Sequence, residues 1–347
     1  MPELFKLVQE ENIGATAIVG MTKNVGKTVT FNYLVKQFER MKIIPGLVSA
    51  GYDGERFDRL TLKEKPRIYA PEGAYVATAK ACFEAAEAGL EYIEEGSAST
   101  PLGGVYIGRV ENAGFVELAG PGSVSGLKEL TSRMFSLGAE HGLVDGAINR
   151  LASASPFLTD AVVLATGASL GPTMKDVISK TAFRRTLLET PVVNDELLRR
   201  MAQMSLERGN AALIYRDGSE YCIEPIRALT PLLAGTEIIN RCTRDTAALV
   251  FGGALVDKNL QEITNLLPLL PKVILRDATK LFITPEFYWR YINRGGKITV
   301  LNQINLVAVT LNPFDPGGRS YDPQQFLEHM TEALKPCPVF DLIYEAG

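Results

Sequence analysis

The segment Gly20 to Val29 combines glycines, lysines and a threonine in an order that could hold the phosphates of a nucleotide; it reads GMTKNVGKTV. Phosphates need several backbone N–H donors that converge on one point, so glycines are required where the chain turns close to the ligand. A helix that begins there adds the positive end of its dipole. Lys27 would reach the β- and γ-phosphates, and the Thr28 hydroxyl would hold Mg²⁺.

The backbone of the same loop would bind the β-phosphate through the amides around Asn24, Val25 and Gly26. Five residues, Met21 to Val25, lie between the glycines, whereas the usual motif has four. The loop is therefore one residue longer, or Gly20 is not its first anchor. A glycine turn with a chance Gly-Lys-Thr is the alternative interpretation. The predicted nucleotide-binding residues are Gly20, Lys23, Asn24, Val25, Gly26, Lys27, Thr28 and Val29.

A magnesium-dependent nucleotide hydrolase also needs an acidic side chain near the end of a neighbouring strand. Glu117 follows an apolar run and precedes glycines, which makes it the best placed. Asp53 follows the second strand, where an acid could order the attacking water or a switch segment. Asp145 is a third candidate, with weaker strand character before it. The sequence therefore predicts Lys27, Asp53 and Glu117 as catalytic residues, and Thr28, Glu117 and Asp53 as metal ligands.

The elements that must position these residues alternate between strand and helix. Residues 16–19 form a continuous apolar run of the kind that a buried parallel strand needs. A helix stripe follows, formed by Phe31, Leu34, Val35, Phe38 and Met41. Residues 43–51 and 160–171 predict further strands, and residues 123–137 and 173–188 predict helices. Strand, loop and helix in succession favour an α/β fold with a mostly parallel sheet flanked by helices, as in P-loop NTPases.

Other parts of the chain give local signals. A helix is expected near residues 79–94, and residues 103–122 predict two strands separated by a turn. Alternating residues around Asp217 and Gly218 predict a hairpin. Pro285 and Pro323 each follow a good helix cap. The expected organisation is a P-loop nucleotide-binding domain over residues 1–207 and a second α/β domain over residues 208–347.

Composition excludes several classes of protein. The 347 residues carry a formal charge of −4, so no positive field draws the chain to nucleic acid or to an anionic membrane. The only histidines are His141 and His329, too few for a multi-histidine metal centre. The four cysteines are far apart and predict reduced thiols. With no apolar run long enough to cross a bilayer and no leader, we expect a cytoplasmic protein that could form a homo-oligomer.

The longer loop ending in VGKT resembles that of dethiobiotin synthetase and related P-loop proteins. The segment VELAG at 116–120 is similar to the strand-end glutamate of that family, which implies Glu117 as a magnesium ligand. That family also has a lysine–proline pair after its second strand, whereas this chain reads GLVSAGYDGE there. The segment keeps Arg56 and Arg59 nearby, so a different ligase or kinase acceptor stays an alternative.

Residues 15–190 together resemble the P-loop subunit of the lysine 5,6-aminomutase reactivase, through SAGYDGE, TPLGGVYIG, VELAGPG, VDGAINRLASASP and DAVVLATGAS. The resemblance implies an ATP-driven chaperone that releases inactivated cobalamin from an adenosylcobalamin-dependent aminomutase. It also implies a second subunit similar to mismatch-repair ATPases, and ATP with Mg²⁺ as the nucleotide. A nucleotide-sensing subunit without enzymatic activity is the third alternative.

Overall fold

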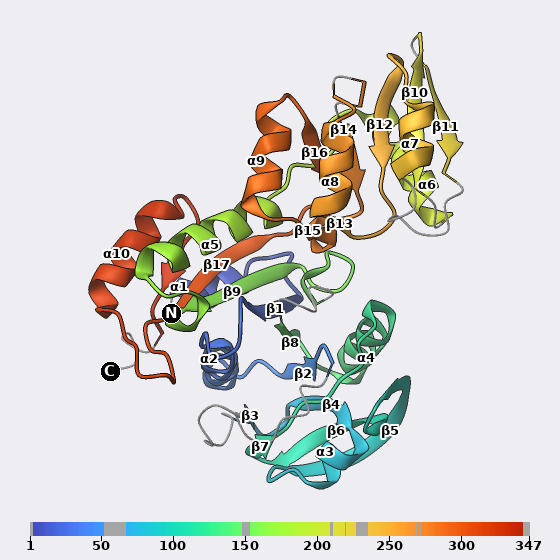
Figure 1. Cartoon of the computed structure of the whole chain (residues 1–347). Coiled ribbons are helices and arrows are strands. Elements are labelled where there is room, and N and C mark those ends of the chain that lie inside the picture. The colour runs from blue at the N-terminus through green and yellow to red at the C-terminus, as the bar shows by residue number, and fades with distance from the viewer. Residues whose placement is uncertain are drawn as a thin grey trace. The chain divides into compact units, whose positions relative to one another are not determined.

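The computed structural model describes residues 3–51, 67–147, 153–208, 211–218, 220–226, 235–267, 269–270 and 272–342. The chain divides into two compact units. Unit 1 comprises Met1–Arg185 and Asn305–Gly347, and unit 2 comprises Thr186–Ile304. Both units are of the α/β type (Figure 1).

Unit 1 is built on a large, mostly parallel sheet. Among the described residues nine strands form it, in the order β18-β17-β9-β1-β8-β2-β4-β6-β5. The first seven run parallel to their neighbours, and β6 and β5 extend the sheet as antiparallel strands. In that order, the strands span Val339–Phe340, Leu306–Asn312, Ala161–Gly167, Ala15–Gly20, His141–Ala147, Pro45–Ser49, Tyr75–Ala79, Gly103–Asn112 and Gly89–Thr100.

Helices and a small second ladder complete unit 1. Strand β3 (Ile68–Ala70) pairs antiparallel with β7 (Gly114–Val116). The helices are α1 (Glu3–Val8), α2 (Lys27–Arg40), α3 (Lys80–Glu84), α4 (Val124–Leu137), α5 (Met174–Leu188) and α10 (Pro323–Ala333), with a 3₁₀ turn η2 at Ala168–Leu170.

Helix α2 packs on one face of the large sheet. Its buried side chains Phe31, Leu34, Val35 and Phe38 share an apolar core with alternate residues of the central strands. Because successive side chains of a strand point to opposite faces, these strand residues define the face that α2 covers. They are Ile18 of β1, Leu143 of β8, Leu47 of β2, Val163 of β9 and Ala308 of β17.

Helix α4 covers the opposite face. Gly46 of β2 and Gly142 of β8 belong to the other strand parity, and both are glycines where the helix approaches. A Cβ at Gly46 would lie 3.3 Å from the Met134 Cβ, and one at Gly142 would lie 3.1 Å from the Thr131 Cγ2. The sheet therefore lies between α2 and α4 (Figure 1).

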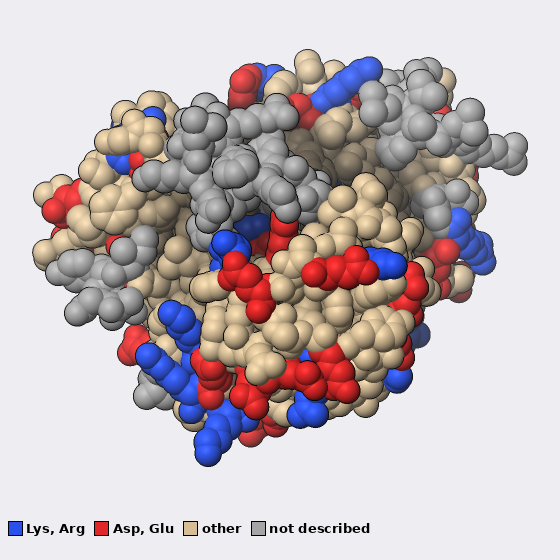
Figure 2. Space-filling view, turned by 90° about the horizontal axis from the view of Figure 1, so that it is seen from below, with Lys and Arg blue, Asp and Glu red and all other residues tan. Residues whose placement is uncertain are grey.

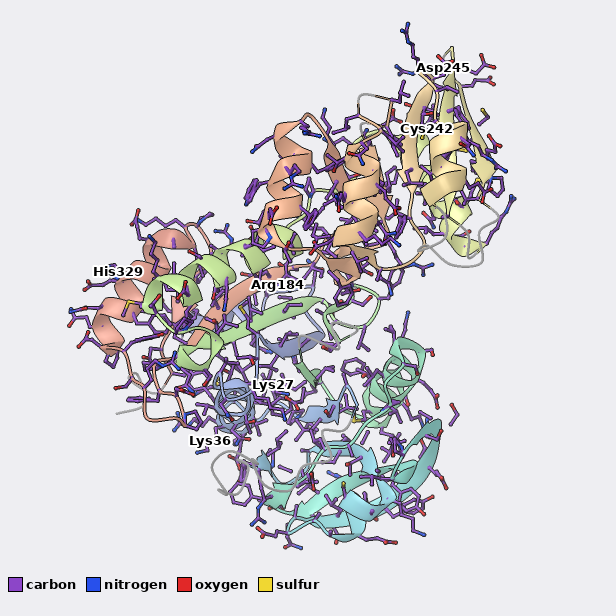
Figure 3. All side chains as sticks on the ribbon, viewed as in Figure 1. Lys27, Lys36, Arg184, Cys242, Asp245 and His329 are labelled. Atoms are coloured by element: carbon purple, nitrogen blue, oxygen red, sulfur yellow. The ribbon has the colours of Figure 1, made fainter. Side chains whose placement is uncertain are left out.

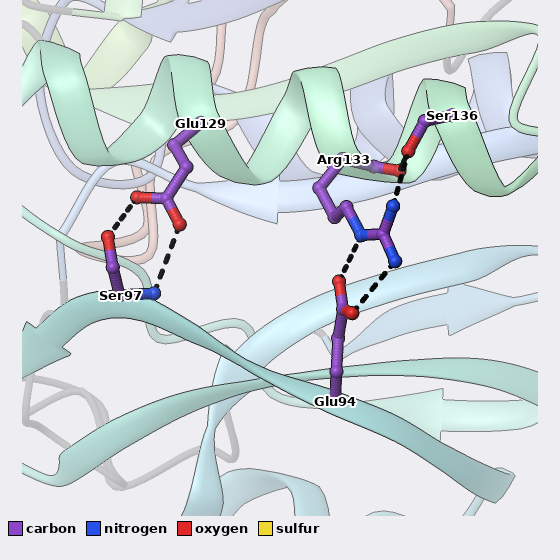
Figure 4. Close-up of polar contacts among 5 residues, drawn as sticks. All are labelled: Glu94, Ser97, Glu129, Arg133 and Ser136. Atoms are coloured by element: carbon purple, nitrogen blue, oxygen red, sulfur yellow. Dashed lines mark hydrogen bonds and ion pairs between the residues drawn. The ribbon is translucent and has the colours of Figure 1, made fainter.

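Polar contacts fasten α4 to the antiparallel strand β5 (Figure 4). Arg133 donates two hydrogen bonds to the carboxylate of Glu94, which lowers the pKa of that carboxyl group. Glu129 accepts from the hydroxyl and the backbone N–H of Ser97. All four residues are at least partly exposed, so these bonds set the register of helix and strand more than they add stability.

Unit 2 has its own sheet and core. Its strands lie in the order β11-β10-β12-β14-β16, with β10 antiparallel to both β11 and β12, and with β12, β14 and β16 parallel. In chain order these strands span Ala212–Asp217, Glu220–Pro225, Thr246–Val250, Lys272–Leu275 and Lys297–Val300. The remaining elements are α6 (Glu196–Glu207), α7 (Gly235–Arg241), α8 (Asp257–Thr264), α9 (Pro285–Asn293), a 3₁₀ turn η4 (Ala278–Lys280) and the short parallel pair β13 (Leu255–Val256) and β15 (Leu281–Phe282).

Several local expectations are confirmed. The predicted helices over 123–137 and 173–188 appear as α4 and α5, and the hairpin around Asp217 appears as β10 and β11. Asp322 caps α10 by accepting from the Gln325 N–H at 2.8 Å. The α/β class with a large, mostly parallel sheet flanked by helices is as expected, and so is a second sheet.

The helix expected near residues 79–94 is wrong. Helix α3 ends at Glu84, and residues 89–100 form β5, which pairs with β6. The alanines and glutamates of this segment favour a helix locally, but the pairing with β6 overrides that preference. Met41, which was expected to belong to the apolar stripe of the helix after residue 27, is 50% exposed, because α2 ends at Arg40.

The two units also differ from the division expected at residue 207. The chain enters unit 2 at Thr186 and returns to unit 1 at Asn305. The return is explained by β17, which pairs in parallel with β9 and thus belongs to the large sheet. None of the described helices is long and apolar enough to cross a membrane.

His141 is a buried polar residue at the start of β8, and it is 2% exposed. Its ring packs on Phe38 with a centroid separation of 4.7 Å, its Nδ1 lies 3.3 Å from the Gln9 amide, and its Nε2 lies 3.0 Å from the Thr16 hydroxyl. A neutral ring satisfies both contacts by accepting at Nδ1 and donating from Nε2. Burial lowers the pKa of His141 from 6.5 to about 4.

We predict that His141 makes unit 1 sensitive to acid. Because the pKa is lower in the folded protein, the unfolded chain takes up this proton first, and stability falls as the pH drops from 6.5 towards 4. The loss should reach about 3 kcal/mol in the free energy of unfolding. Urea unfolding at several pH values should show a shallower slope for His141→Gln than for the unmodified chain. His329→Gln, at an exposed position, is the control and should leave the slope unchanged; equal slopes in all three proteins would contradict the assignment.

Candidate functional site

The loop between β1 and α2 is tightly folded. Asn24 and Gly26 both have positive φ, at 62° and 87°. A Cβ on Gly20 would lie 3.2 Å from the Val25 Cγ2 and 3.3 Å from the Thr22 carbonyl oxygen, and the Val25 side chain is buried beneath the loop. Glycine at position 20 thus allows the five intervening residues to fold back closely, which agrees with Gly20 as the first anchor of a longer loop.

Helix α2 begins at the end of this loop, at Lys27. Gly26 is its N-cap and provides no side-chain acceptor, and the first helical bond runs from the Thr30 N–H to the Gly26 carbonyl at 3.0 Å. Helix geometry gives the N–H groups of Lys27, Thr28 and Val29 no partner within the helix. With the helix dipole, these donors suit an anion. Lys23, Asn24 and Val29 are exposed, and Thr28 is half-buried.

The Lys27 side chain meets Asp145 of β8. Its Nζ lies 3.1 Å from the Asp145 Oδ2, and the two side chains are 22% and 16% exposed. Strand β8 is the direct neighbour of β1, with Ile18 opposite Asp145 in the register. Asp145 shares strand parity with Leu143, so its side chain is on the face that α2 covers. The structure thereby brings a lysine and a carboxylate together where the loop and the strand end meet.

Strand β17 reaches the same loop from the other side of β1. The Asn312 Nδ2 donates to the Asn24 carbonyl at 2.8 Å, and the Thr310 and Thr30 hydroxyls lie 2.8 Å apart. Asn312 also lies close to Gly26, because a Cβ built on Gly26 would be 3.1 Å from the Cβ of Asn312. A residue 288 positions further along the chain thus holds the carbonyl of a left-handed residue in the loop.

Glu117 is placed differently from Asp145. Its side chain is exposed, and its carbonyl accepts from the Thr78 hydroxyl at 2.8 Å. The following residues run beside the ends of β4 and β2, where the Ala79 N–H donates to Ala119 and the Gly120 N–H donates to Gly51. Glu117 therefore lies near the carboxyl ends of parallel strands, but Asp145 is the acid that contacts Lys27. Asp53, Arg56 and Arg59 lie outside the described residues.

Sequence reasoning ranked Asp145 below Glu117 and missed Asn312. The strand around Asp145 contains two glycines, Gly142 and Gly146, which weaken its strand signal. The glycines are explained by packing: a Cβ at Gly146 would lie 2.0 Å from the Ser153 hydroxyl oxygen. For Asn312 the only available signal was its position at the end of an apolar run, which does not reveal the strand's neighbours.

A metal site made only of side chains is not a feature of the described part of the chain. No group of three or more His, Cys, Asp or Glu side chains gathers there. Mg²⁺ commonly takes one or two protein oxygens together with phosphates and water, so Thr28 and Asp145 would be a sufficient donor set. On the face in Figure 2, Lys and Arg occur together with Asp and Glu, and neither sign covers the described surface.

Comparisons with known proteins add no assignment. No protein family model, no curated protein and no solved structure matches the chain.

The placement of the Glu117 segment can be tested with a pair of glycines. A Cβ at Gly120 would come within 1.8 Å of the Ser49 carbonyl oxygen, whereas one at Gly122 would meet nothing within 4 Å. We expect Gly120→Ala to reduce the free energy of unfolding by about 1–3 kcal/mol or more, because backbone must move. Gly122→Ala should stay within about 0.5 kcal/mol of the unmodified chain in urea unfolding. Equal effects of both substitutions would contradict the packing of this segment on β2.

Proposed function

We propose that this chain binds a magnesium–nucleoside triphosphate in the loop Gly20–Val29 and hydrolyses it. The observation that carries the proposal is the Lys27–Asp145 contact at the start of α2. This contact brings together Lys27 as a cation for phosphates, Asp145 as an acid for a metal, and the N-terminus of α2, all at the carboxyl ends of the strands. In parallel α/β sheets ligands bind outside the carboxyl ends of strands, where the strand order reverses. Here the chain continues from β1 to β2 on one side and from β9 to β17 on the other, so the order reverses between the neighbouring strands β1 and β9.

Each residue of the site has a role in this proposal. Lys27 exchanges Asp145 for the β- and γ-phosphates, and Asp145 becomes available to a metal ion together with Thr28. Bound Mg²⁺ would neutralise charge on the phosphates. The N–H groups of the first helical turn bind phosphate oxygens, and Asn312 keeps the loop in the conformation that presents them. Asp53 and Glu117 stay candidates for ordering the attacking water and for the metal.

We further propose the biological role that the resemblance implies. Hydrolysis of the nucleotide, expected to be ATP, would drive the release of damaged cobalamin from an adenosylcobalamin-dependent aminomutase, together with a subunit similar to mismatch-repair ATPases. The two-unit organisation supports such a role, because a second folded unit is available for contacts beyond the nucleotide. Hydrolysis should then be slow in the isolated chain and faster with the partner enzyme. Phosphorylation of a small molecule would favour the ligase or kinase alternative, and binding without turnover would favour the sensing subunit.

Removing the Lys27 ammonium should weaken nucleotide binding. A hydrogen bond to a charged group contributes about 1.5–3 kcal/mol, so Lys27→Ala should weaken binding of the magnesium–triphosphate by about ten- to a hundredfold in calorimetry. Lys36→Ala is the matched control, because Lys36 is an exposed lysine on the same helix (Figure 3). Thermal unfolding of each variant verifies the fold. If the Lys27→Ala and Lys36→Ala variants bind the magnesium–triphosphate equally tightly, the assignment of the site is wrong.

Asp145→Asn should separate metal binding from nucleotide binding. The amide keeps the shape of the side chain but loses the charge that Mg²⁺ prefers. We expect the nucleotide affinity in EDTA to stay the same or to rise, because Lys27 loses its competing partner, whereas the gain in affinity on adding Mg²⁺ should fall by about tenfold or more. An undiminished effect of Mg²⁺ would transfer the metal role to Glu117 or Asp53.

A further inference from the structure

Three aromatic side chains form a cluster on the antiparallel end of the large sheet. Phe83 of α3, Tyr92 of β5 and Tyr106 of β6 pack edge to face, with ring centroids 4.9, 5.8 and 6.4 Å apart. Tyr92 is 52% exposed, so this cluster, which we call the aromatic face, reaches the surface. Strands β8, β2 and β4 lie between β6 and β1, so the aromatic face is separate from the candidate nucleotide site (Figure 1).

Two glycines of β6 make room for neighbouring side chains on this face. Gly104 and Gly108 share strand parity with Tyr106. A Cβ at Gly108 would lie 2.5 Å from the Phe83 ring, and one at Gly104 would lie 1.8 Å from the Glu95 Oε1. The Phe83 ring and the Glu95 carboxylate therefore lie directly on the strand, one on each side of Tyr106.

A cation of the chain itself already lies on the aromatic face. The Lys80 Nζ is 5.8 Å from the centroid of the Tyr106 ring and 3.8 Å from a carboxylate oxygen of Glu84. The faces of aromatic rings attract cations through their quadrupole, and a carboxylate adds its full charge. Lys80 thus shows which sign of charge this face favours. The more exposed ring of Tyr92 is the one that a cation from outside would reach.

The elements around the aromatic face carry an excess of acidic residues. Residues 80–112 contain six glutamates and only two basic residues, Lys80 and Arg109, which gives a formal charge of −4. The whole chain also has a formal charge of −4, so the remaining residues are neutral in total. A surface of this charge repels nucleic acid, anionic lipid and the same surface of a second copy, and it attracts a positively charged protein segment.

An arginine side chain matches the arrangement of Tyr92 and Glu95 better than a lysine does. A guanidinium is planar, so it can stack on an aromatic ring while two of its N–H groups bond one carboxylate. The Tyr92 ring packs on Tyr106, and Glu95 lies opposite Tyr106 in the register of β5 and β6. The exposed carboxylate and the exposed ring are therefore on the same face of the sheet.

We infer that the aromatic face docks a basic segment of a protein partner, with an arginine guanidinium stacked on Tyr92 and bonded to Glu95. The inference goes beyond the proposed function and does not depend on nucleotide binding. Because the charges are exposed, the interaction should weaken with rising salt.

The test uses a fluorescently labelled peptide of alternating glycine and arginine, with the corresponding lysine and glutamate peptides for comparison. Each is titrated into the full chain at physiological ionic strength, and binding is followed by fluorescence anisotropy. The arginine peptide should bind several-fold more tightly than the lysine peptide, and the glutamate peptide should not bind. Glu95→Gln should weaken binding of the arginine peptide by about two- to fivefold, as expected for an exposed ion pair.

Glu91→Gln is the matched control, because it removes the same charge from the same strand. Glu91 lies opposite Arg109 in the register, and Arg109 has the strand parity opposite to Tyr106, so Glu91 is on the other face of the sheet. This substitution should change the affinity by less than about twofold. Equal losses for Glu91→Gln and Glu95→Gln would mean that only the overall charge attracts the peptide, and would overturn the inference.

Two substitutions of Tyr92 separate the aromatic ring from the apolar bulk. Tyr92→Leu should weaken binding of the arginine peptide by about two- to fivefold, whereas Tyr92→Phe should retain the affinity. Thermal unfolding verifies the fold of each variant. Lys27→Ala should bind the peptide as the unmodified chain does, so this inference and the nucleotide proposal can fail separately.

Three further results would also contradict the assignment. The first is equal binding of the arginine and lysine peptides, and the second is no binding of the arginine peptide up to millimolar concentration. The third is a dimer, detected by light scattering, that Tyr92→Leu dissociates, because a second copy would then cover the aromatic face.

Discussion

The packing of α2 against the face of the sheet that carries Ile18 and Leu143 is the constraint on which the candidate site depends. The helix starts directly after β1 and must run back along the sheet to bury Phe31, Leu34 and Phe38. This return places the N-terminus of the helix at the carboxyl edge of the sheet. The same face of β8 then contacts the helix at both ends, through His141 on Phe38 and through Asp145 on Lys27.

The Lys27–Asp145 pair is, under the proposed function, the arrangement that a nucleotide would replace. Both side chains keep part of their exposure, so the pair itself adds little net stability. Its effect is to hold a cation and an anion side by side where the loop meets the end of β8. A magnesium–triphosphate carries both complementary charges and can replace each partner by another. Under the proposed function, the site would therefore stay formed at low electrostatic cost until a nucleotide binds.

Strand β17 gives unit 1 its second constraint. Unit 2 begins at Thr186, in the last turn of α5, and ends before β17, where the chain returns to pair with β9. Residues 308, 310 and 312 share one strand parity, and all three lie towards α2 or its loop: Ala308 is in the core with Phe31, Thr310 is at Thr30, and Asn312 is at Asn24. The segment that supports the loop between β1 and α2 is thus the first part of the chain to follow the insertion.

The sequence by itself determined the local features of this protein: the buried strand before Gly20, the helix stripe after Lys27, the hairpin at Asp217 and the α/β class. These follow from periodicity and from residue types that act within a few positions of each other. Position 26 is an example, since glycine there accommodates the positive φ that the loop requires.

Only the tertiary structure decided which strands are neighbours, because the pairing of parallel strands depends on contacts between distant segments that leave no local pattern. It made a strand of the glycine-containing segment around Asp145 and set it beside β1. It turned residues 89–100 from an expected helix into β5, and it brought Asn312 to a loop nearly 290 residues earlier. The sequence therefore singled out the glycine-containing loop between β1 and α2 as a candidate, while the partners of Lys27 and Asn24 came from the fold.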